Sequence, residues 1–133
     1  MEQQQQAQQY QELQQQIQQI QQSIQELDQR IGNVEDAVEG VKGIKDIEEG
    51  DEILASIGAG AFAVAEIKNT EEVVTNIGGE AYERKSLEKA EELLNSHVEE
   101  MNETKDTLES EASELQSQMQ QLQMQIQQGM QGE

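Results

Sequence analysis

Residues 87–126 read LEKAEELLNSHVEEMNETKDTLESEASELQSQMQQLQMQI, with an apolar side chain at every seventh position from Leu87 to Leu122. The repeating residues are Leu87, Leu94, Met101, Leu108, Leu115 and Leu122, and four of them are followed four residues later by Val98, Ala112, Met119 or Ile126. A helix with one apolar pair in every seven residues presents a narrow seam that it cannot bury alone. The stretch therefore predicts a long helix that pairs with another. Glu91 and Lys105 interrupt the seam, and such polar residues lower stability but can fix the register.

A second heptad stripe lies earlier in the chain. Its members alternate spacings of three and four residues: Tyr10, Leu13, Ile17, Ile20, Ile24, Leu27, Ile31, Val34, Val38 and Val41. Residues 1–9, which are mostly Gln, precede the stripe. Because Gln is a good helix former, we expect them to extend this helix. The pattern predicts a first helix that ends near Ile44, where Gly40 and Gly43 weaken it.

Residues 45–84 break the helical pattern. Four short apolar runs, at 53–57, 61–67, 73–77 and 81–83, alternate with turn residues. They predict two β-hairpins, and strands so few and short are not stable as an isolated sheet. Their edges therefore need partners. We expect an oligomer interface formed by Ile53, Leu54, Ile57, Phe62, Val64, Ile67, Val73, Val74, Ile77 and Tyr82.

The order of these segments predicts a mainly α protein, an antiparallel two-helix coiled coil with two central β-hairpins. We expect a single domain over residues 1–133, with helices at 1–44 and 85–133 and the hairpins at 45–84.

The free ends of the two predicted helices carry apolar residues among Gln. If the chain folds back so that Ile44 lies near Leu87, then Leu122 and Ile126 face residues 3–8, which are Gln and Ala. Those apolar groups would lack a full partner, and flexible Met side chains suit adaptable apolar binding. The alternative is that these are simply the last turns of a coiled coil. The candidate binding residues are Tyr10, Leu13, Met119, Leu122, Met124, Ile126 and Met130.

Composition narrows the possible partners. The net charge is −20, from 28 acidic and 8 basic residues. Nucleic-acid binding draws on Lys and Arg, so this balance argues against DNA, RNA or an anionic membrane. The excess of acidic residues either forms an ordinary solvated surface or is an adaptation to a cytoplasm at very high salt. At such a salt concentration, screening removes the repulsion between the acidic side chains. No apolar run resembles a signal peptide or a membrane span, which favours a cytoplasmic location.

No group of residues predicts catalysis. Gly58-Ala59-Gly60 begins like a dinucleotide-binding fingerprint, but Ala63 replaces the third Gly and no amphipathic helix follows. With no Cys and His97 as the single His, a transition-metal site or a nucleophilic relay lacks its parts. We expect no enzyme, no metal and no cofactor.

Two segments carry a resemblance to a known family: residues 52–62, EILASIGAGAF, and residues 77–84, IGGEAYER. Placed between two heptad helices, they resemble the alpha subunits of archaeal prefoldins, and the resemblance covers essentially the whole chain. The chain departs from that pattern at Ser56, where the family typically carries Pro. It is also more acidic and richer in Gln than most relatives, which fits a salt-loving archaeon.

The resemblance implies an ATP-independent holdase chaperone. Two alpha and four beta subunits would join their hairpins into an oligomeric β-barrel body. The coiled-coil tips would bind non-native proteins and deliver them to a group II chaperonin. Two other readings stay open: a coiled-coil tether or scaffold without client binding, and a parallel homodimeric coiled coil that regulates a partner. The central hairpins argue against the parallel dimer, which favours a continuous seam.

Overall fold

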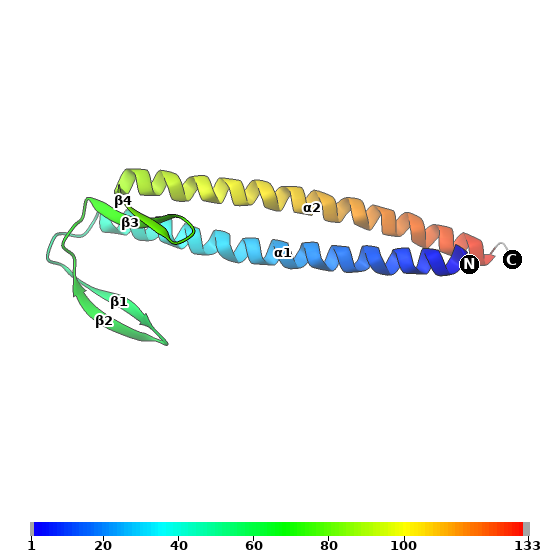
Figure 1. Cartoon of the computed structure of the whole chain (residues 1–133), viewed down its shortest axis with the longest axis horizontal. Helices are drawn as coiled ribbons and strands as arrows, with labels where there is room; N and C mark the ends of the chain where they lie inside the picture. The colour runs from blue at the N-terminus through cyan, green and yellow to red at the C-terminus, as the bar shows by residue number, and fades with distance from the viewer. Residues whose placement is uncertain (1, 132–133) are drawn as a thin grey trace. The chain divides into compact units, whose positions relative to one another are not determined.

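The computed structural model describes the backbone of residues 2–131 and the side chains of residues 2–129. Its elements are α1 (Glu2–Ile44), β1 (Glu52–Gly58), β2 (Ala61–Glu66), β3 (Glu72–Gly78), β4 (Ala81–Ser86) and α2 (Leu87–Gln131) (Figure 1). They form two compact units. The two-helix unit combines the described parts of Met1–Ile31 and Glu99–Glu133, and the hairpin unit spans Gly32–Val98. The predicted class, two long helices around two β-hairpins, is confirmed.

Both predicted helices are present, and both ends of the first are as expected. α1 begins at Glu2, so the Gln-rich start is helical. It continues through Gly32 and Gly40 and ends at Ile44, after which Lys45 and Asp46 form a turn closed by backbone hydrogen bonds to Lys42 and Gly43. α2 follows β4 directly, and the Lys89 N–H donates to the Ser86 hydroxyl at 3.2 Å. Ser86 is therefore the N-cap.

The four predicted strands form two separate antiparallel pairs, β1–β2 and β3–β4. β4 is longer than the predicted run at 81–83, because its pairing with β3 continues to Glu72–Ser86. The polar residues Arg84, Lys85 and Ser86 concealed this extension, since only a hydrogen-bonded partner strand reveals it.

The two hairpins are built alike. β1–β2 pairs Glu52 with Glu66 at its open end, and β3–β4 pairs Glu72 with Ser86, twenty residues later in both strands. Each ladder is irregular at one place, around Ile57 in the first hairpin and around Ile77 in the second. Such a bulge adds one residue to one strand and increases the local twist. The hairpins are thus two copies of one structural unit.

The hairpin turns explain the glycines. Ala59 and Gly60 connect β1 to β2 with φ of 51° and 78°, and a two-residue turn with φ positive at both positions matches the twist of the strands. In the second turn Gly79 has φ 59°, and Asn76 holds it by accepting from the Gly78 N–H at 2.7 Å and donating to the Gly79 carbonyl at 3.0 Å. Gly58–Gly60 is therefore a tight connection between two paired strands.

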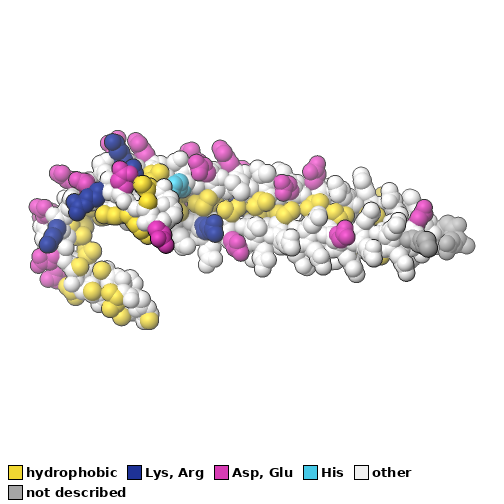
Figure 2. All heavy atoms as spheres, in the orientation of Figure 1, with side chains coloured by type: hydrophobic (Ala, Val, Ile, Leu, Met, Phe, Trp, Pro, Cys, Tyr) yellow, Lys and Arg dark blue, Asp and Glu magenta, His cyan; other side chains and the backbone are white. Residues whose placement is uncertain are grey.

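The heptad residues form the seam in each unit. Buried seam residues are Ile17, Ile31 and Leu122 in the two-helix unit and Val38, Val41, Leu87 and Ala90 in the hairpin unit. Most of the other heptad residues are half-buried, as expected when two helices share one narrow interface. Figure 2 shows these hydrophobic side chains gathered in a line along the helices, bordered by acidic residues.

The register of the helix pair differs from the prediction by about one turn. In the two-helix unit Lys105 pairs with Asp28, and Leu115 lines a recess together with Ile20 and Gln16. In the hairpin unit Lys45 reaches Glu91, so the end of α1 lies beside the second turn of α2. The cause is the connection: four strands separate the helices, so no tight loop aligns their ends.

No helix within residues 2–131 combines the length and the apolar character that crossing a membrane requires.

Candidate interaction surfaces

Exposed hydrophobic residues are concentrated in the hairpins. Among the described side chains nine large hydrophobic residues are exposed, and eight of them lie between residues 53 and 82. The eight are Ile53, Leu54, Ile57, Phe62, Val64, Val74, Ile77 and Tyr82, and the ninth is Met124 in α2. Ile67 and Val73, the other two predicted interface residues, are half-buried. A single chain rarely leaves so many apolar groups in water without a partner for them.

The first hairpin is apolar on both faces. One face carries Leu54 opposite Val64, and the other carries Ile53 opposite Ala65. Leu54 and Val64 are 67% and 69% exposed in the single chain. Strands that are apolar on both sides are typical of sheets covered on both sides. β1–β2 therefore has the composition of a buried hairpin but is exposed in the isolated chain.

The second hairpin mixes apolar and charged residues. Val74 lies opposite Arg84 on one face, and Val73 lies opposite Lys85 on the other. Val73, Val74 and Arg84 line a small recess together with Asn69 and Glu72. The positions of Val64 and Ala65 in the first hairpin correspond to those of Arg84 and Lys85 in the second. The second hairpin therefore has a similar backbone but a more polar surface than the first. The two hairpins are suited to different neighbours.

Both polar residues in the seam of α2 form ion pairs with α1. In the hairpin unit the Lys45 ammonium donates to the Glu91 carboxylate at 3.1 Å, and Lys42 lies 3.9 Å from it. In the two-helix unit the Lys105 ammonium contacts the Asp28 carboxylate at 2.7 Å. That hydrogen bond raises the pKa of Lys105 above its ordinary value. The sequence pattern identified Glu91 and Lys105 as interruptions but did not reveal their partners, of which Asp28 and Lys42 lie on α1 and Lys45 directly follows it.

The predicted binding residues at the helix ends do not share one environment. Tyr10, Leu13, Met119 and Ile126 are half-buried, and Met124 is 59% exposed. The expectation that Leu122 lacks a partner is wrong, because Leu122 is only 8% exposed. The one-turn difference in register accounts for this burial, because it moves Leu122 toward later residues of α1, where the heptad stripe begins. The side chain of Met130 lies outside the described residues.

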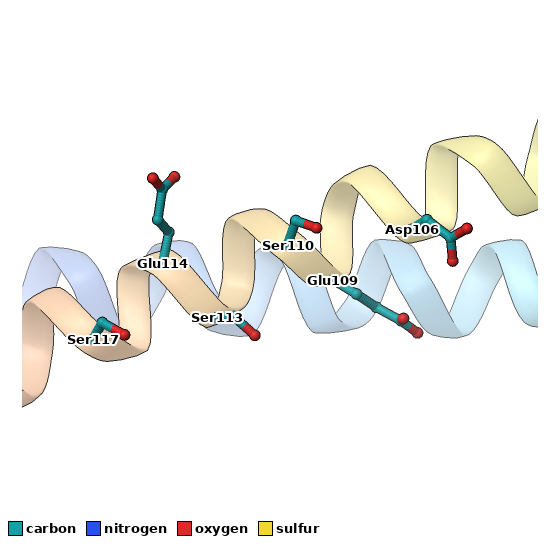
Figure 3. A pocket seen from close by; sticks show the side chains of 6 residues that line it. All are labelled: Asp106, Glu109, Ser110, Ser113, Glu114 and Ser117. Carbon is teal, nitrogen blue, oxygen red and sulfur yellow. The ribbon is translucent and has the colours of Figure 1, made fainter.

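A shallow recess on α2 has no apolar side chain among the residues that line it. Asp106, Glu109 and Glu114 line it together with Ser110, Ser113 and Ser117 (Figure 3). The side chains point in several directions and do not converge on one point. Within the described residues no group of three or more acidic or His side chains is placed to hold a metal ion.

The twenty-residue repeat of the hairpins was visible in the sequence but was not recognised. Ile57-Gly58 recurs as Ile77-Gly78, and Ala61-Phe62 recurs as Ala81-Tyr82. Recognising this spacing would have extended the fourth predicted strand, because the run at 61–67 corresponds to residues 81–87.

Comparison with known proteins identifies the family. The model of the prefoldin subunit family matches residues 13–132. The chain belongs to the prefoldin family. A chain in the cryo-EM structure of filamentous PFD from Methanocaldococcus jannaschii has the same fold, with a TM-score of 0.82 and 19% sequence identity. The match covers 90% of this chain and 98% of that chain. No curated protein is significantly similar in sequence to the chain with the two hairpins described above.

Membership of the prefoldin family indicates what type of protein this chain is. Prefoldins are a family of chaperones and not of enzymes, so the chain is a chaperone-type subunit. In this prefoldin-family chain, eight of the nine large hydrophobic residues that are exposed among the described side chains lie in the hairpin unit, and the ninth, Met124, lies in the two-helix unit.

Proposed function

We propose that this chain is the alpha-type subunit of an archaeal prefoldin, a holdase that binds non-native proteins without ATP and passes them to a group II chaperonin. The observation that carries the proposal is the concentration of exposed apolar residues in the two hairpins of a prefoldin-family chain. The whole chain, residues 1–133, acts as a single domain in the cytoplasm. It has no cofactor, and it binds neither nucleic acid nor membrane.

Assembly uses the hairpins. Two copies of the chain join four beta-type subunits, and the hairpins complete a β-barrel body in which Leu54, Val64 and Val74 lose their exposure. Each fully buried Leu or Val side chain contributes about 1.5–3 kcal/mol. The more polar β3–β4 and the more apolar β1–β2 contact different neighbours in this body.

Client binding uses the ends of the helices. Tyr10, Leu13, Met119, Ile126 and Met130 contribute to it, and Met124 is the residue with the largest available apolar area. Leu122 supports this surface from the seam. A few apolar contacts of this size hold a client weakly and reversibly, as a carrier without a nucleotide cycle requires.

One experiment tests both roles. Ile57 and Val74 are 69% and 63% exposed in the single chain. Replacing either residue with Asp therefore puts a carboxylate in water, and the isolated chain keeps its far-UV helicity. In the assembly the same carboxylate would be buried without a partner, which costs several kcal/mol. We expect light scattering with a co-expressed beta-type subunit to show release of each variant from the complex. Because the released chain no longer contributes to the complex, protection of a denatured client from aggregation, measured without nucleotide, should also decrease.

Ser96→Asp is the matched control, because Ser96 is an exposed residue of α2 in the same unit. It adds the same charge outside the hairpins and should change neither the mass of the complex nor the protection of the client. A complex mass unaffected by Ile57→Asp and Val74→Asp would refute the hairpin interface. A wild-type complex that assembles but protects no client would favour a tether or scaffold instead.

A further inference from the structure

Charge is distributed unevenly in the two-helix unit. Residues 115–131 of α2 contain no charged residue, and residues 2–25 of α1 contain only Glu2 and Glu12. By contrast, residues 26–31 and 99–114 of the same unit contain nine acidic residues against Arg30 and Lys105. One end of this unit therefore has little of the charge that dominates the chain, and its charged side chains are Glu2, Glu12 and, in sequence, Glu133. We call residues 2–25 and 115–131 the neutral end.

Glutamine occupies the surface of the neutral end. Fifteen of residues 2–25 and nine of residues 115–131 are Gln, and all of those with described side chains except the half-buried Gln6 are exposed. Figure 2 shows few acidic side chains on this end, beside the residues drawn in grey. Gln and Glu are similarly good helix formers, so the helices do not require amides here. Unlike Glu, Gln carries no charge, and its amide group can both donate and accept hydrogen bonds.

Apolar groups lie among these amides. Met124 is 59% exposed, and a recess is lined by Ile20, Leu115, Gln16 and Gln19, with Glu111 and Glu114 at its acidic side. Amide groups can pair with the free N–H and C=O groups of an unfolded chain whatever its sequence, because every residue presents them. The neutral end thus combines apolar contact with hydrogen bonding to peptide groups.

We propose that the neutral end binds acidic non-native polypeptides. This inference rests on the holding function proposed above and names its client class. An acidic client is repelled by the carboxylates of residues 99–114. At about 0.1 M salt the Debye length is about 10 Å, whereas the helix rise places the last described turn of α2 about 25 Å beyond Glu114. Repulsion is therefore screened at this end, and an acidic chaperone can hold clients as acidic as itself.

Two unfolded probes of similar size test the proposal: reduced, carbamidomethylated α-lactalbumin, which is acidic, and reduced, carbamidomethylated lysozyme, which is basic. Their binding to the full chain in its assembled state is measured by fluorescence anisotropy. The test variant replaces Gln116, Gln120, Gln123 and Gln127 by Glu, and the control variant replaces Asn102, Thr104, Ser110 and Ser113 by Glu. All eight side chains are exposed, so both variants add four charges to the surface of α2.

We expect the wild type to bind both probes. The test variant should bind the acidic probe at least tenfold more weakly than wild type in 0.1 M KCl, and within threefold of wild type in 2 M KCl, while it still binds lysozyme. The control variant should bind the acidic probe as wild type does. Equal affinity of the wild type and the test variant for the acidic probe, or an equal loss in the control, overturns the inference. Wild type that binds only lysozyme overturns it but leaves the holding function intact, and wild type that binds neither probe overturns both.

Discussion

At the residue scale, Leu122 and Met124 show how two neighbouring apolar side chains take different roles. Leu122 stands on the heptad stripe and is 8% exposed, whereas Met124 lies off the stripe and is 59% exposed. Both belong to the two-helix unit. The difference follows from the helical period, because positions two residues apart point to different sides of a helix. Leu122 therefore stabilises the helix pair, and Met124 is available to other molecules.

Alanine at each position should separate the two roles. Leu122→Ala removes a buried seam side chain and should lower the free energy of unfolding by about 2 kcal/mol, at the low end for buried Leu because the seam is narrow. Met124→Ala should change it by less than about 0.5 kcal/mol but reduce client protection several-fold. Urea unfolding and an aggregation assay measure the two effects. The assignment fails if Met124→Ala leaves protection intact.

At the element scale, polar residues in the seam match α1 to α2. In the hairpin unit α2 contributes the carboxylate of Glu91 to the pair, and in the two-helix unit it contributes the ammonium of Lys105. Glu91 and Lys105 are two heptads apart, so a slip of two heptads would bring Lys105 opposite Lys42 and Lys45. Like charges in contact oppose such a slip. The ion pairs thus disfavour an alternative register more than they add stability.

Lys105→Leu should raise Tm, because an apolar side chain completes the seam while Asp28, which is half exposed, keeps its water. The hydrogen bond to Asp28 raises the pKa of Lys105, so the contribution of the pair is fully present below the ordinary Lys pKa. It is lost only as the pH rises through the raised value. Tm measured from pH 6 to 8 should therefore show no step that Lys105→Leu removes. A lower Tm for Lys105→Leu would mean that the ion pair outweighs apolar packing here.

At the scale of the whole molecule, charge is the dominant property. The chain carries 28 acidic and 8 basic residues, and the ion pairs of the described residues involve only a few of the acidic side chains. Most of the others are exposed side chains of the helices and of the hairpin segment, where they repel one another. The Debye length falls from about 30 Å at 0.01 M to about 3 Å at 1 M salt, so stability should depend on salt far more than in a balanced protein.

Tm and far-UV helicity should rise steeply from 0.1 to 2 M KCl. A variant with Gln in place of Glu99, Glu103, Glu111 and Glu114, which are exposed residues of the two-helix unit, should show a smaller rise. Circular dichroism at several salt concentrations measures both. A Tm that does not change over this range would rule out adaptation to high salt, although it would leave the fold unaffected.

The sequence by itself determined the kind, order and approximate ends of the elements. Heptad spacing and turn residues are local signals, so they predicted α1, α2 and the four strands. The resemblance carried by residues 52–62 and 77–84 led to the family that residues 13–132 match. The excess of acidic residues and the neutral end can also be read from the chain alone.

Only the tertiary structure decided which residues face one another. A heptad stripe defines a seam but leaves its register open, because a slip of one turn or one heptad still places apolar groups opposite apolar groups. Hence the burial of Leu122 and the partners of Glu91 and Lys105 could not be derived beforehand. The extension of β4 had the same cause, since residues 84–86 become a strand through hydrogen bonds to β3 and not through their own propensity.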